Sequence, residues 1–356
     1  MDQGESLEET GKSKYEFLYG KVALVDADII VHRSAAIAEP VRYLVITSDE
    51  HTSTLTQFDD AKSSKEFAGD TGIIWSRKED KGLDFALAVT HKTIETILEN
   101  SKPKEARFYL SGKDNFRLKV AKTIPYKGSR ELVAKPKYYR ELRKVLTEEY
   151  GATVAQGYEA DDAIGMVTGE LGEESFICTI DKDMDQLAGW HYDWVKDRVY
   201  RVSRKDADFN LYAQVLSGDS TDDVPGLLGI GPIKARRILD GAVDSADLLR
   251  RTWDQYRSTG NGSEAQRWDY FIEQLRLVYI LRHSDDLFDV DMSYEQVFGK
   301  GDSCENITEA VNLDRKLNEA PLENLPSSES SGNLNKLKSR IQAQSEGESA
   351  SSVEAQ

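Results

Sequence analysis

The chain has 356 residues, a formal net charge of −17, and a composition that is 31% charged and 39% hydrophobic. This length is sufficient for one large domain with its own core and a smaller appended unit. The cysteines, Cys178 and Cys304, supply neither a disulfide framework nor a zinc-binding spacing. The acidic, polar N-terminus excludes a signal peptide, and no apolar run approaches the roughly 18 residues of a membrane span. We therefore expect a soluble, cytoplasmic protein with no membrane partner.

The basic residues are concentrated in one segment. Residues 113–144 hold 11 Lys or Arg and 3 acids, a local charge of +8 that leaves −25 on the remainder. A basic segment on an acidic body is typical of an element that follows a phosphate backbone. Tyr126 lies beside Lys127 and Arg130, which favours nucleic acid because aromatic rings stack on bases while cations contact phosphates. On charge alone, the cations are also compatible with a merely solvated helix.

Strands and helices alternate along the first half of the chain. Strands are expected at residues 21–31, 106–110, 151–155 and 175–180, with an antiparallel edge pair at 190–195 and 198–202, and helices at 83–98, 137–149 and from Glu159 onward. Continuously apolar strands joined by helices predict a three-layer α/β fold with a mostly parallel sheet. Residues 41–80 read as an insertion whose runs 43–47 and 72–75 form a hairpin with a polar loop between them.

The boundaries follow from composition. We expect a disordered leader at 1–20, an α/β core at 21–208, a helical C-terminal subdomain at 209–320 and a disordered tail at 321–356. Within the subdomain, a Gly229-Ile-Gly231 turn enters a helix and presents backbone N–H groups to an anion, usually a phosphate. In the tail, Leu334, Leu337 and Ile341 form either a short amphipathic stripe for a partner or part of a passive segment.

Acidic residues recur where strands end or helices begin. Asp26 ends the first strand, and three clusters follow at residues 158–162, 181–185 and 219–223. Because ligand-binding residues of open α/β sheets gather at the carboxyl ends of strands, these acids are expected to converge. Like charges repel strongly in a shared site of low dielectric, so cations must fill it. Oxygen-only ligands favour Mg²⁺, Mn²⁺ or Ca²⁺.

The acids have two simpler interpretations, a calcium-binding loop and a set of helix caps in solvated loops. An EF-hand starting at Asp181 requires Gly and Glu where the chain has Gln186 and Tyr192. Helix caps and solvated loops suit Asp185 and Asp223. They do not suit Asp26 and Asp181, because an unpaired carboxylate at the end of a buried strand has a large desolvation cost. Metal-binding acids, a basic aromatic segment and a phosphate-binding turn together predict phosphodiester hydrolysis on DNA or RNA.

The motifs resemble those of the 5′-nuclease superfamily, which includes flap endonucleases, the 5′-nuclease domain of DNA polymerase I and stand-alone bacteriophage 5′–3′ exonucleases. The matching blocks, in order, are Val25-Asp26, Phe116-Arg117, Tyr126 to Arg130, Glu159 to Asp162, Asp181 to Met184, and Gly218 to Gly226 running into Gly229 to Gly231. They cover roughly residues 21 to 240. No polymerase domain follows, which favours the stand-alone bacteriophage branch. The resemblance implies a PIN-like core with a helical arch at 113–144 and a helix-hairpin-helix type turn in the C-terminal subdomain.

The resemblance also implies roles for individual residues. The first metal would be held by Asp26, Glu159, Asp161 and Asp162, and the second by Asp181, Asp183, Asp219 and Asp222, directly or through water. Lys127 and Arg130 would contact the scissile phosphate, Tyr126 would stack on a base, and Arg117 would also contact DNA. Gly229, Gly231 and Lys234 would grip the duplex backbone, with K⁺ at the turn. The family has an acid near Ser111 or Gly112; this chain has none there, and the role of Asp114 stays open.

The activity implied by this resemblance is that of a 5′–3′ exonuclease or flap endonuclease. It would use two or more Mg²⁺, with Mn²⁺ as a substitute, and leave 5′-phosphates. Expected partners are duplex DNA with a 5′ end, nick or flap, an RNA primer in an RNA–DNA hybrid, and a replication protein bound by the tail. A phage-encoded protein would act in the host cytoplasm. The alternatives are a DNA-junction binding protein with vestigial activity, and an RNA-cleaving PIN-like nuclease.

Overall fold

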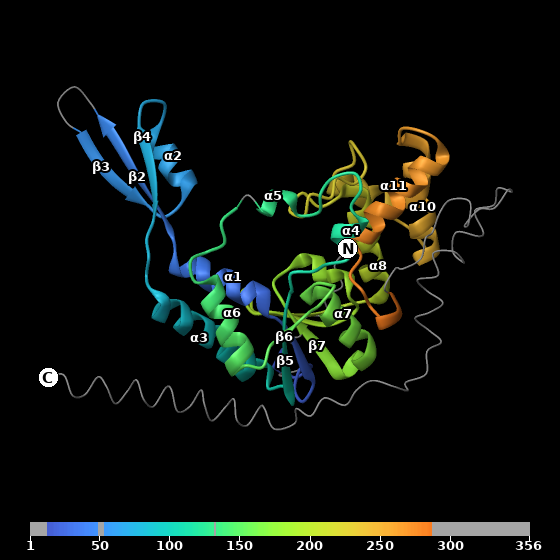
Figure 1. Cartoon of the computed structure of the whole chain (residues 1–356), viewed down its shortest axis with the longest axis horizontal. Coiled ribbons are helices and arrows are strands. Elements are labelled where there is room, and N and C mark those ends of the chain that lie inside the picture. The colour runs from blue at the N-terminus through green and yellow to red at the C-terminus, as the bar shows by residue number, and fades with distance from the viewer. Residues whose placement is uncertain (1–12, 49–52, 132, 287–356) are drawn as a thin grey trace.

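A computed structural model describes residues 13–48, 53–131 and 133–286 (Figure 1). The first part of the expected leader, the end of the expected helical subdomain and the whole expected tail lie outside these ranges. Residues 13–20 differ from the expectation of disorder. Leu18 is fully buried and Phe17 stacks on Trp190 with ring centroids 4.7 Å apart. Apolar side chains therefore attach this part of the leader to the core.

The core is a six-stranded sheet with the strand order β6-β5-β1-β7-β8-β9. All neighbouring strands are parallel except the edge pair β8 and β9, so the predicted mostly parallel sheet and its antiparallel edge are confirmed. The first strand ends at Asp26, five residues earlier than predicted. The strands are β1 Val22–Asp26, β5 Glu105–Leu110, β6 Thr153–Val154, β7 Ser175–Cys178, β8 Gly189–Asp193 and β9 Arg198–Val202.

Helices cover both faces of the sheet, which gives the three layers expected from the sequence. In β1, Ala23 and Val25 face one apolar cluster, while Val22 and Leu24 face the other. The first cluster packs under α1, α3 and α6, and the second under α7. This alternation follows from the two-residue period of a strand. The helices are α1 Ala27–Ala38, α3 Leu83–Ser101, α6 Tyr139–Glu149 and α7 Ala160–Leu171.

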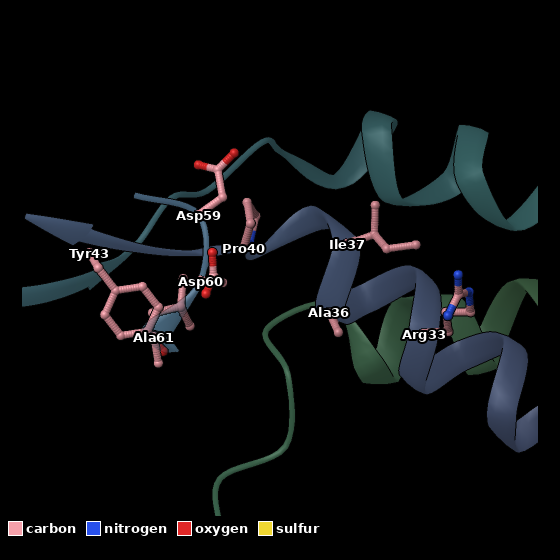
Figure 2. Close-up of a pocket in the computed structure, with 9 residues that line it drawn as sticks. Arg33, Ala36, Ile37, Pro40, Tyr43, Asp59, Asp60 and Ala61 are labelled. Atoms are coloured by element: carbon pink, nitrogen blue, oxygen red, sulfur yellow. The ribbon is translucent and has the colours of Figure 1, made fainter. Parts of the chain in front are cut away.

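The insertion is a small sheet of its own that projects from the end of α1 (Figure 1). Its strand order is β3-β2-β4, so the predicted pairing of residues 43–47 with 72–75 is confirmed, but a third strand and a helix occupy the expected loop. A hollow of about 580 Å³ lies between α1 and the insertion, lined by Arg33, Tyr43 and Asp59 among others (Figure 2). The elements are β2 Val41–Ser48, β3 Ser53–Phe58, α2 Ala61–Ala68 and β4 Ile73–Lys78.

The basic segment crosses from the C-terminal helices to α6 and contains two short helices, α4 Arg117–Val120 and α5 Gly128–Glu131 (Figure 1). Its far end is anchored to the base of the insertion. The backbone N–H of Lys137 donates to Glu39 Oε2 at 2.6 Å, and the hydroxyl of Tyr138 donates to Asp80 Oδ1 at 2.5 Å. We call residues 113–144 the arch segment.

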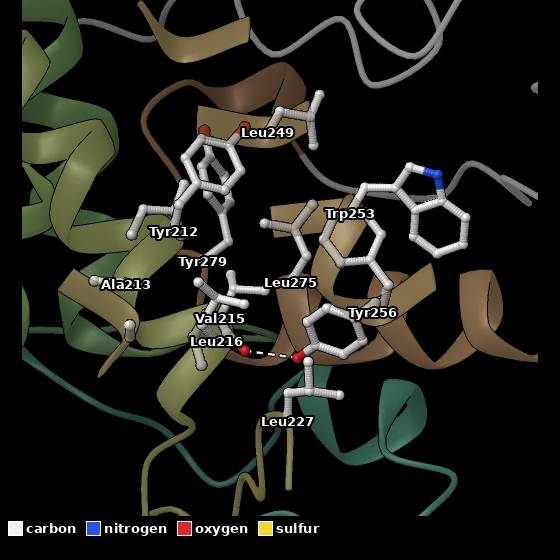
Figure 3. Close-up of a cluster of buried hydrophobic side chains, with 14 of the residues drawn as sticks. Tyr212, Ala213, Val215, Leu216, Leu227, Leu249, Trp253, Tyr256, Leu275 and Tyr279 are labelled. Carbon is white, nitrogen blue, oxygen red and sulfur yellow. Dashed lines mark hydrogen bonds between the residues drawn. The ribbon is translucent and has the colours of Figure 1, made fainter. Parts of the chain in front are cut away.

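The C-terminal helices enclose a second apolar core. Trp253 and Tyr256 are buried in it, and the Tyr256 hydroxyl donates to the carbonyl of Val215 at 2.6 Å (Figure 3). Val215 belongs to α8, which begins at Arg204 and therefore slightly before the predicted domain boundary at residue 209. The helices are α8 Arg204–Ser217, α9 Pro232–Leu239, α10 Ser245–Thr259 and α11 Glu264–Val278.

Candidate active site

Asp26 joins the end of β1 to the start of α1. It is 2% exposed, and its Oδ1 caps the helix by accepting the Ile29 N–H at 3.2 Å. Its Oδ2 accepts the Thr179 hydroxyl, which lies just beyond β7, at 3.0 Å. Burial, with the negative charges of Asp28 and Asp181, raises the pKa of Asp26 to about 7. The carboxylate is thus held beside other acids, and within the described part of the chain it forms no ion pair with a cation.

Helix α7 brings two further acids to the same end of the sheet. Glu159 is its N-cap residue and Asp161 lies in its first turn. Burial raises the pKa of Asp161 well above its ordinary value, and the charges of Asp26, Glu159 and Asp181 raise it further, while Lys127 opposes them. Among the described residues, no hydrogen bond or ion pair reaches the Asp161 carboxylate. The carboxyl ends of β1 and β7 and the start of α7 therefore meet, as predicted from the sequence.

A second group of acids adjoins the first. Asp181 caps the short helix η3 Lys182–Gln186, with its Oδ1 accepting the Asp183 N–H at 2.9 Å. Burial raises the pKa of Asp183 to about 7, assisted by the charges of Asp181 and Asp219 and by a hydrogen bond with Asp219. Asp219 also accepts the Thr221 N–H at 2.8 Å. Residues separated by nearly forty positions thus share one negative region.

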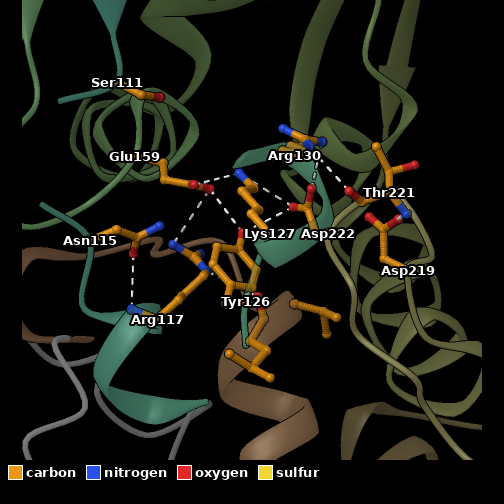
Figure 4. Close-up of polar contacts among 12 residues, drawn as sticks. Ser111, Asn115, Arg117, Tyr126, Lys127, Arg130, Glu159, Asp219, Thr221 and Asp222 are labelled. Atoms are coloured by element: carbon orange, nitrogen blue, oxygen red, sulfur yellow. Dashed lines mark hydrogen bonds and ion pairs between the residues drawn. The ribbon is translucent and has the colours of Figure 1, made fainter. Parts of the chain in front are cut away.

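The arch segment places two cations against the acids (Figure 4). Lys127 Nζ lies 2.5 Å from Glu159 Oε1 and 3.4 Å from Asp222 Oδ2. Arg130 Nη2 lies 2.5 Å from Asp222 Oδ1, and its Nε donates to the Thr221 carbonyl at 3.1 Å. Burial raises the pKa of Asp222, whereas Lys127 and Arg130 act to lower it. The two cations expected at the scissile phosphate are therefore at the rim of the acid site.

Arg117 and Asp162 form a buried pair, which corrects two expectations. Arg117 is 2% and Asp162 0% exposed, and their bidentate contacts measure 2.6 and 2.8 Å. The guanidinium also donates to the carbonyls of Leu277 and Tyr279, while Asp162 accepts the Leu281 N–H and, through its other oxygen, the Glu159 N–H. Arg117 therefore lies out of reach of DNA, and both oxygens of Asp162 are engaged by protein donors rather than free for a metal.

Tyr126 also differs from its expected role as a platform for a base. Its ring is 5% exposed and belongs to the core of the C-terminal helices. Its hydroxyl donates to Asp222 Oδ2 at 3.0 Å and to Glu159 Oε2 at 3.2 Å. Burial, with the charge of Glu159, raises the pKa of Tyr126 far above its usual range, so the hydroxyl stays a donor. In this conformation the residue orients acids instead of stacking.

An acid that was not predicted as a site residue contacts the residue that follows β5. Asp28, in the first turn of α1, accepts the Ser111 N–H through Oδ2 at 2.6 Å. Asp114, the residue left open, is exposed. A carboxylate thus lies at the position where the resemblance implied one, although it comes from another element. The sequence feature that could have identified Asp28 is its position two residues after Asp26.

The remaining expected site residues belong to the turn before α9. Gly229 has a φ of +79°, a backbone conformation that favours glycine, and Gly231 is the N-cap residue of α9. Gly229, Gly231 and Lys234 are all exposed, and the Lys234 ammonium donates to the Gly229 carbonyl at 3.3 Å. The turn therefore presents an exposed helix N-terminus with a lysine beside it.

The acidic side chains of this site are candidate ligands for a metal ion. Among the described residues, no group of three or more His, Cys, Asp or Glu side chains is placed to hold a metal ion. The donor set is nevertheless one that suits a divalent cation, since Asp26, Asp161 and Asp183 are carboxylates whose pKa is raised by burial and by neighbouring acids. Within the same ranges, no helix is long and apolar enough to cross a membrane.

The chain is similar to several known proteins over part of its length. No protein-family model matches the chain. The chain is 30% identical over 113 residues to a 5′–3′ exonuclease of Aquifex aeolicus, which covers 28% of this chain and 39% of that protein. It is 32% identical over 108 residues to the DNA polymerase I of Rhizobium leguminosarum, with 27% and 11% covered, and 30% identical over 111 residues to the flap endonuclease Xni of Shewanella sediminis, with 28% and 43% covered.

The matched region thus confirms the resemblance to the 5′-nuclease superfamily. The relatives that match this chain are proteins named 5′–3′ exonuclease, flap endonuclease Xni and DNA polymerase I. The chain spans less than half the length of each of these relatives. Among solved structures, the phage T5 D15 protein with metal ions has a TM-score of 0.42 and 18% identity, covering 54% of this chain and 81% of that chain. The closer resemblance to the bacteriophage branch stays a prediction.

Proposed function

We propose that this chain is a divalent-metal-dependent 5′-nuclease that hydrolyses DNA phosphodiester bonds from 5′ ends or at 5′ flaps and leaves 5′-phosphates. The observation that carries the proposal is the position of Asp161. Its carboxylate makes no hydrogen bond or ion pair among the described residues, and the charges of the neighbouring acids outweigh the opposing charge of Lys127. A group of neighbouring carboxylates that nearby cations compensate only in part is unfavourable without a bound cation.

The metal would be Mg²⁺, with Mn²⁺ as a substitute. Asp26, Glu159 and Asp161 would hold one ion, and Asp181, Asp183, Asp219 and Asp222 would serve a second. Bound cations of this kind activate water and stabilise the leaving oxygen of an in-line displacement. Asp162 is left out of the direct ligands because Arg117 and two backbone N–H groups occupy its oxygens.

The chain's own cations would act on the substrate. Lys127 and Arg130 pair with Glu159 and Asp222 in this structure, and a phosphate entering the site would compete for both. Fixed positive groups at this position stabilise charge that develops during phosphoryl transfer. Gly229, Gly231 and Lys234 would bind the duplex backbone through the helix N-terminus, with K⁺ at the turn. Recognition by backbone contacts selects DNA ends and junctions without reading base sequence.

The biological setting is proposed on the same basis. Duplex DNA with a 5′ end, a nick or a 5′ flap is the expected substrate, and an RNA primer in an RNA–DNA hybrid is the second. The protein would act in the cytoplasm, during replication or repair, or in phage DNA processing in the host. A replication protein would bind the C-terminal tail.

A second candidate function is a DNA-junction binding protein with vestigial nuclease activity. One observation favours it: in the described ranges, no three acidic side chains are already arranged around a metal position. Against it, the chain keeps the carboxylates, and a carboxylate lies against Ser111 after all.

A cleavage assay separates these functions. Blunt, nicked and 5′-flap duplexes labelled at the 5′ end are incubated with the full chain in Mg²⁺, in Mn²⁺ and in EDTA, beside an RNA version of the flap. The proposal predicts metal-dependent release of short labelled products from DNA and none in EDTA. Tight binding without cleavage in either metal indicates the junction-binding function, and a preference for single-stranded RNA indicates the PIN-like alternative.

A further inference from the structure

Two side chains and the backbone N–H and carbonyl of one residue close a ring at the edge of the acid site. Asp28 Oδ2 accepts the Ser111 N–H at 2.6 Å, and Asp28 Oδ1 lies 2.6 Å from Arg143 Nη1. Arg143 Nη2 donates to the Ser111 carbonyl at 2.7 Å. The Asp28 and Arg143 side chains are 19% and 20% exposed, so water screens their contact less than it screens a surface ion pair. We call this ring the clasp.

The clasp joins both ends of the arch segment to one point. Ser111 directly follows β5 and precedes the segment, whereas Arg143 lies at the segment's end, on α6. Asp28 is two residues from Asp26, in the first turn of α1. The two ends of a segment that carries Lys127 and Arg130 are therefore fastened beside a candidate metal ligand.

The clasp also reaches the helix that carries the other acids. The Ser111 hydroxyl accepts the N–H of Ala160, the first residue of α7, at 3.0 Å. Ala160 lies between Glu159 and Asp161 in the chain. Ser111 is thus hydrogen-bonded directly to the start of α1 and to the start of α7.

We propose that Asp28, Ser111 and Arg143 are positioning residues that hold the arch cations and the metal-binding carboxylates in one register for cleavage. This inference rests on the proposed nuclease function. Displacements of about 1 Å in groups remote from the chemistry lower rates by about a hundredfold. Arg143 makes its two contacts through the planar fork of its guanidinium, and lysine at this position supplies only one point of contact.

The test compares Asp28→Asn, Arg143→Lys and Arg143→Gln with a matched control. Arg107→Gln removes an arginine–carboxylate pair with Glu105 at the opposite end of β5, at a similar exposure. For each protein, single-turnover cleavage of a 5′-flap duplex, flap affinity in Ca²⁺, the Mg²⁺ concentration for half-maximal rate and the melting temperature are measured. If Asp28 and Arg143 only stabilise the fold, their substitution lowers the melting temperature. The Mg²⁺ concentration for half-maximal rate, measured at a temperature where the protein is folded, then stays unchanged.

The expected result is a rate reduced by about tenfold or more in Asp28→Asn and Arg143→Gln, with flap affinity in Ca²⁺ within about twofold of wild type. Both variants need more Mg²⁺ for half-maximal rate, and Arg143→Lys lies between them and wild type. The double variant Asp28→Asn/Arg143→Gln, measured in the same way, is no worse than the more affected single variant. Arg107→Gln matches wild type in rate. If Arg143→Gln does not fold, the rate and Mg²⁺ requirement of Arg143→Lys are compared with those of wild type and Arg107→Gln instead.

Two failures are distinguishable. Wild-type protein that binds the flap but does not cleave it overturns the proposed function, and the positioning role with it. Wild-type protein that cleaves, with Asp28→Asn and both Arg143 variants indistinguishable from Arg107→Gln in rate and Mg²⁺ requirement, overturns the clasp alone.

Discussion

Lys127 Nζ lies 2.5 Å from Glu159 Oε1, and this contact connects the arch segment to the helix that carries the acids. Lys127 has a φ of +55°, an uncommon backbone conformation for a residue other than glycine, and its N–H donates to the Asp222 carbonyl at 2.9 Å. Burial acts to lower the pKa of Lys127, but the charges of Glu159 and Asp222 outweigh it and raise the pKa. The side chain is therefore a fixed cation at the edge of the site.

Lys127→Ala is expected to lower the single-turnover cleavage rate about a hundredfold, because a preorganised cation facing the developing charge is lost. Duplex affinity measured in Ca²⁺ should change much less, since the turn at Gly229 and Gly231 remains. Lys92→Ala, which removes an exposed lysine paired with Glu95 on α3, is the control for loss of one charge. An unchanged rate in Lys127→Ala would remove this residue from the reaction.

Arg117 is expected to act in stability and not in DNA contact. Arg117→Ala leaves Asp162 as a buried carboxylate without its partner, and breaking such a pair costs about 3–5 kcal/mol. Urea unfolding followed by circular dichroism measures the loss. Arg107→Ala, at a half-buried pair with Glu105, should cost far less. A variant with wild-type stability but weakened DNA binding would restore the role that the sequence suggested.

Asp208 predicts a pH dependence of stability. It is 3% exposed, with Arg282 Nη1 2.5 Å from its Oδ1. Burial acts to raise the Asp208 pKa, but Arg282 and Arg204 together lower it below its ordinary value of 3.8. The unfolded state therefore binds the proton first as pH falls, so the stabilisation is complete above about pH 4 and is lost as pH drops through the folded pKa.

The measurement for Asp208 is urea unfolding as a function of pH. At neutral pH, Asp208→Asn is expected to be about 3 kcal/mol less stable than wild type, because Arg282 is left buried without a counter-charge. The difference should shrink as the wild-type carboxylate is protonated below pH 4. A difference that is constant down to pH 2 would show that the charge of Asp208 does not contribute.

Divalent metal is expected to stabilise the folded chain in the absence of DNA. Ions that bind only the folded state raise its unfolding free energy, by about 2.7 kcal/mol at a hundred times the dissociation constant. Melting temperatures in Mg²⁺ and Mn²⁺ should therefore exceed those in EDTA for wild type, and the increase should be smaller for Asp161→Asn, which loses a ligand of one of the two ions. Asp185→Asn, whose carboxylate accepts the Tyr200 hydroxyl at 2.8 Å, should keep the effect. Equal melting temperatures with and without metal for wild type would argue against a metal site.

Much of the fold was predictable because its signals are local. Asp26 was expected near the end of the first strand, yet the strand itself was predicted too long. An apolar run such as Ile29 to Val31 fits a buried strand and a buried helix equally, and only the cap made by Asp26 decides for the helix. Strand β3 of the insertion is mostly exposed and polar, so no hydrophobic periodicity identified it in the sequence.

The acids of the site were predictable from the sequence, whereas the residues that contact them were less so. Arg117 and Asp162 are 45 positions apart, and nothing local to either residue signals that they pair. Tyr126 directly precedes Lys127 in the sequence, but its ring is buried by helices that lie much later in the chain. Asp28 was missed because its partners, Ser111 and Arg143, come from two other elements.

The central claim is that the acids at the carboxyl end of the sheet bind metal for cleavage. Its most direct test is Asp181→Ala, since Asp181 contributes to the raised pKa of Asp26, Asp161 and Asp183. Single-turnover cleavage of a 5′-flap duplex in Mg²⁺ is measured beside flap affinity in Ca²⁺ and in EDTA. We expect cleavage to be abolished while the affinity stays near that of wild type. Cleavage at the wild-type rate by Asp181→Ala would contradict it.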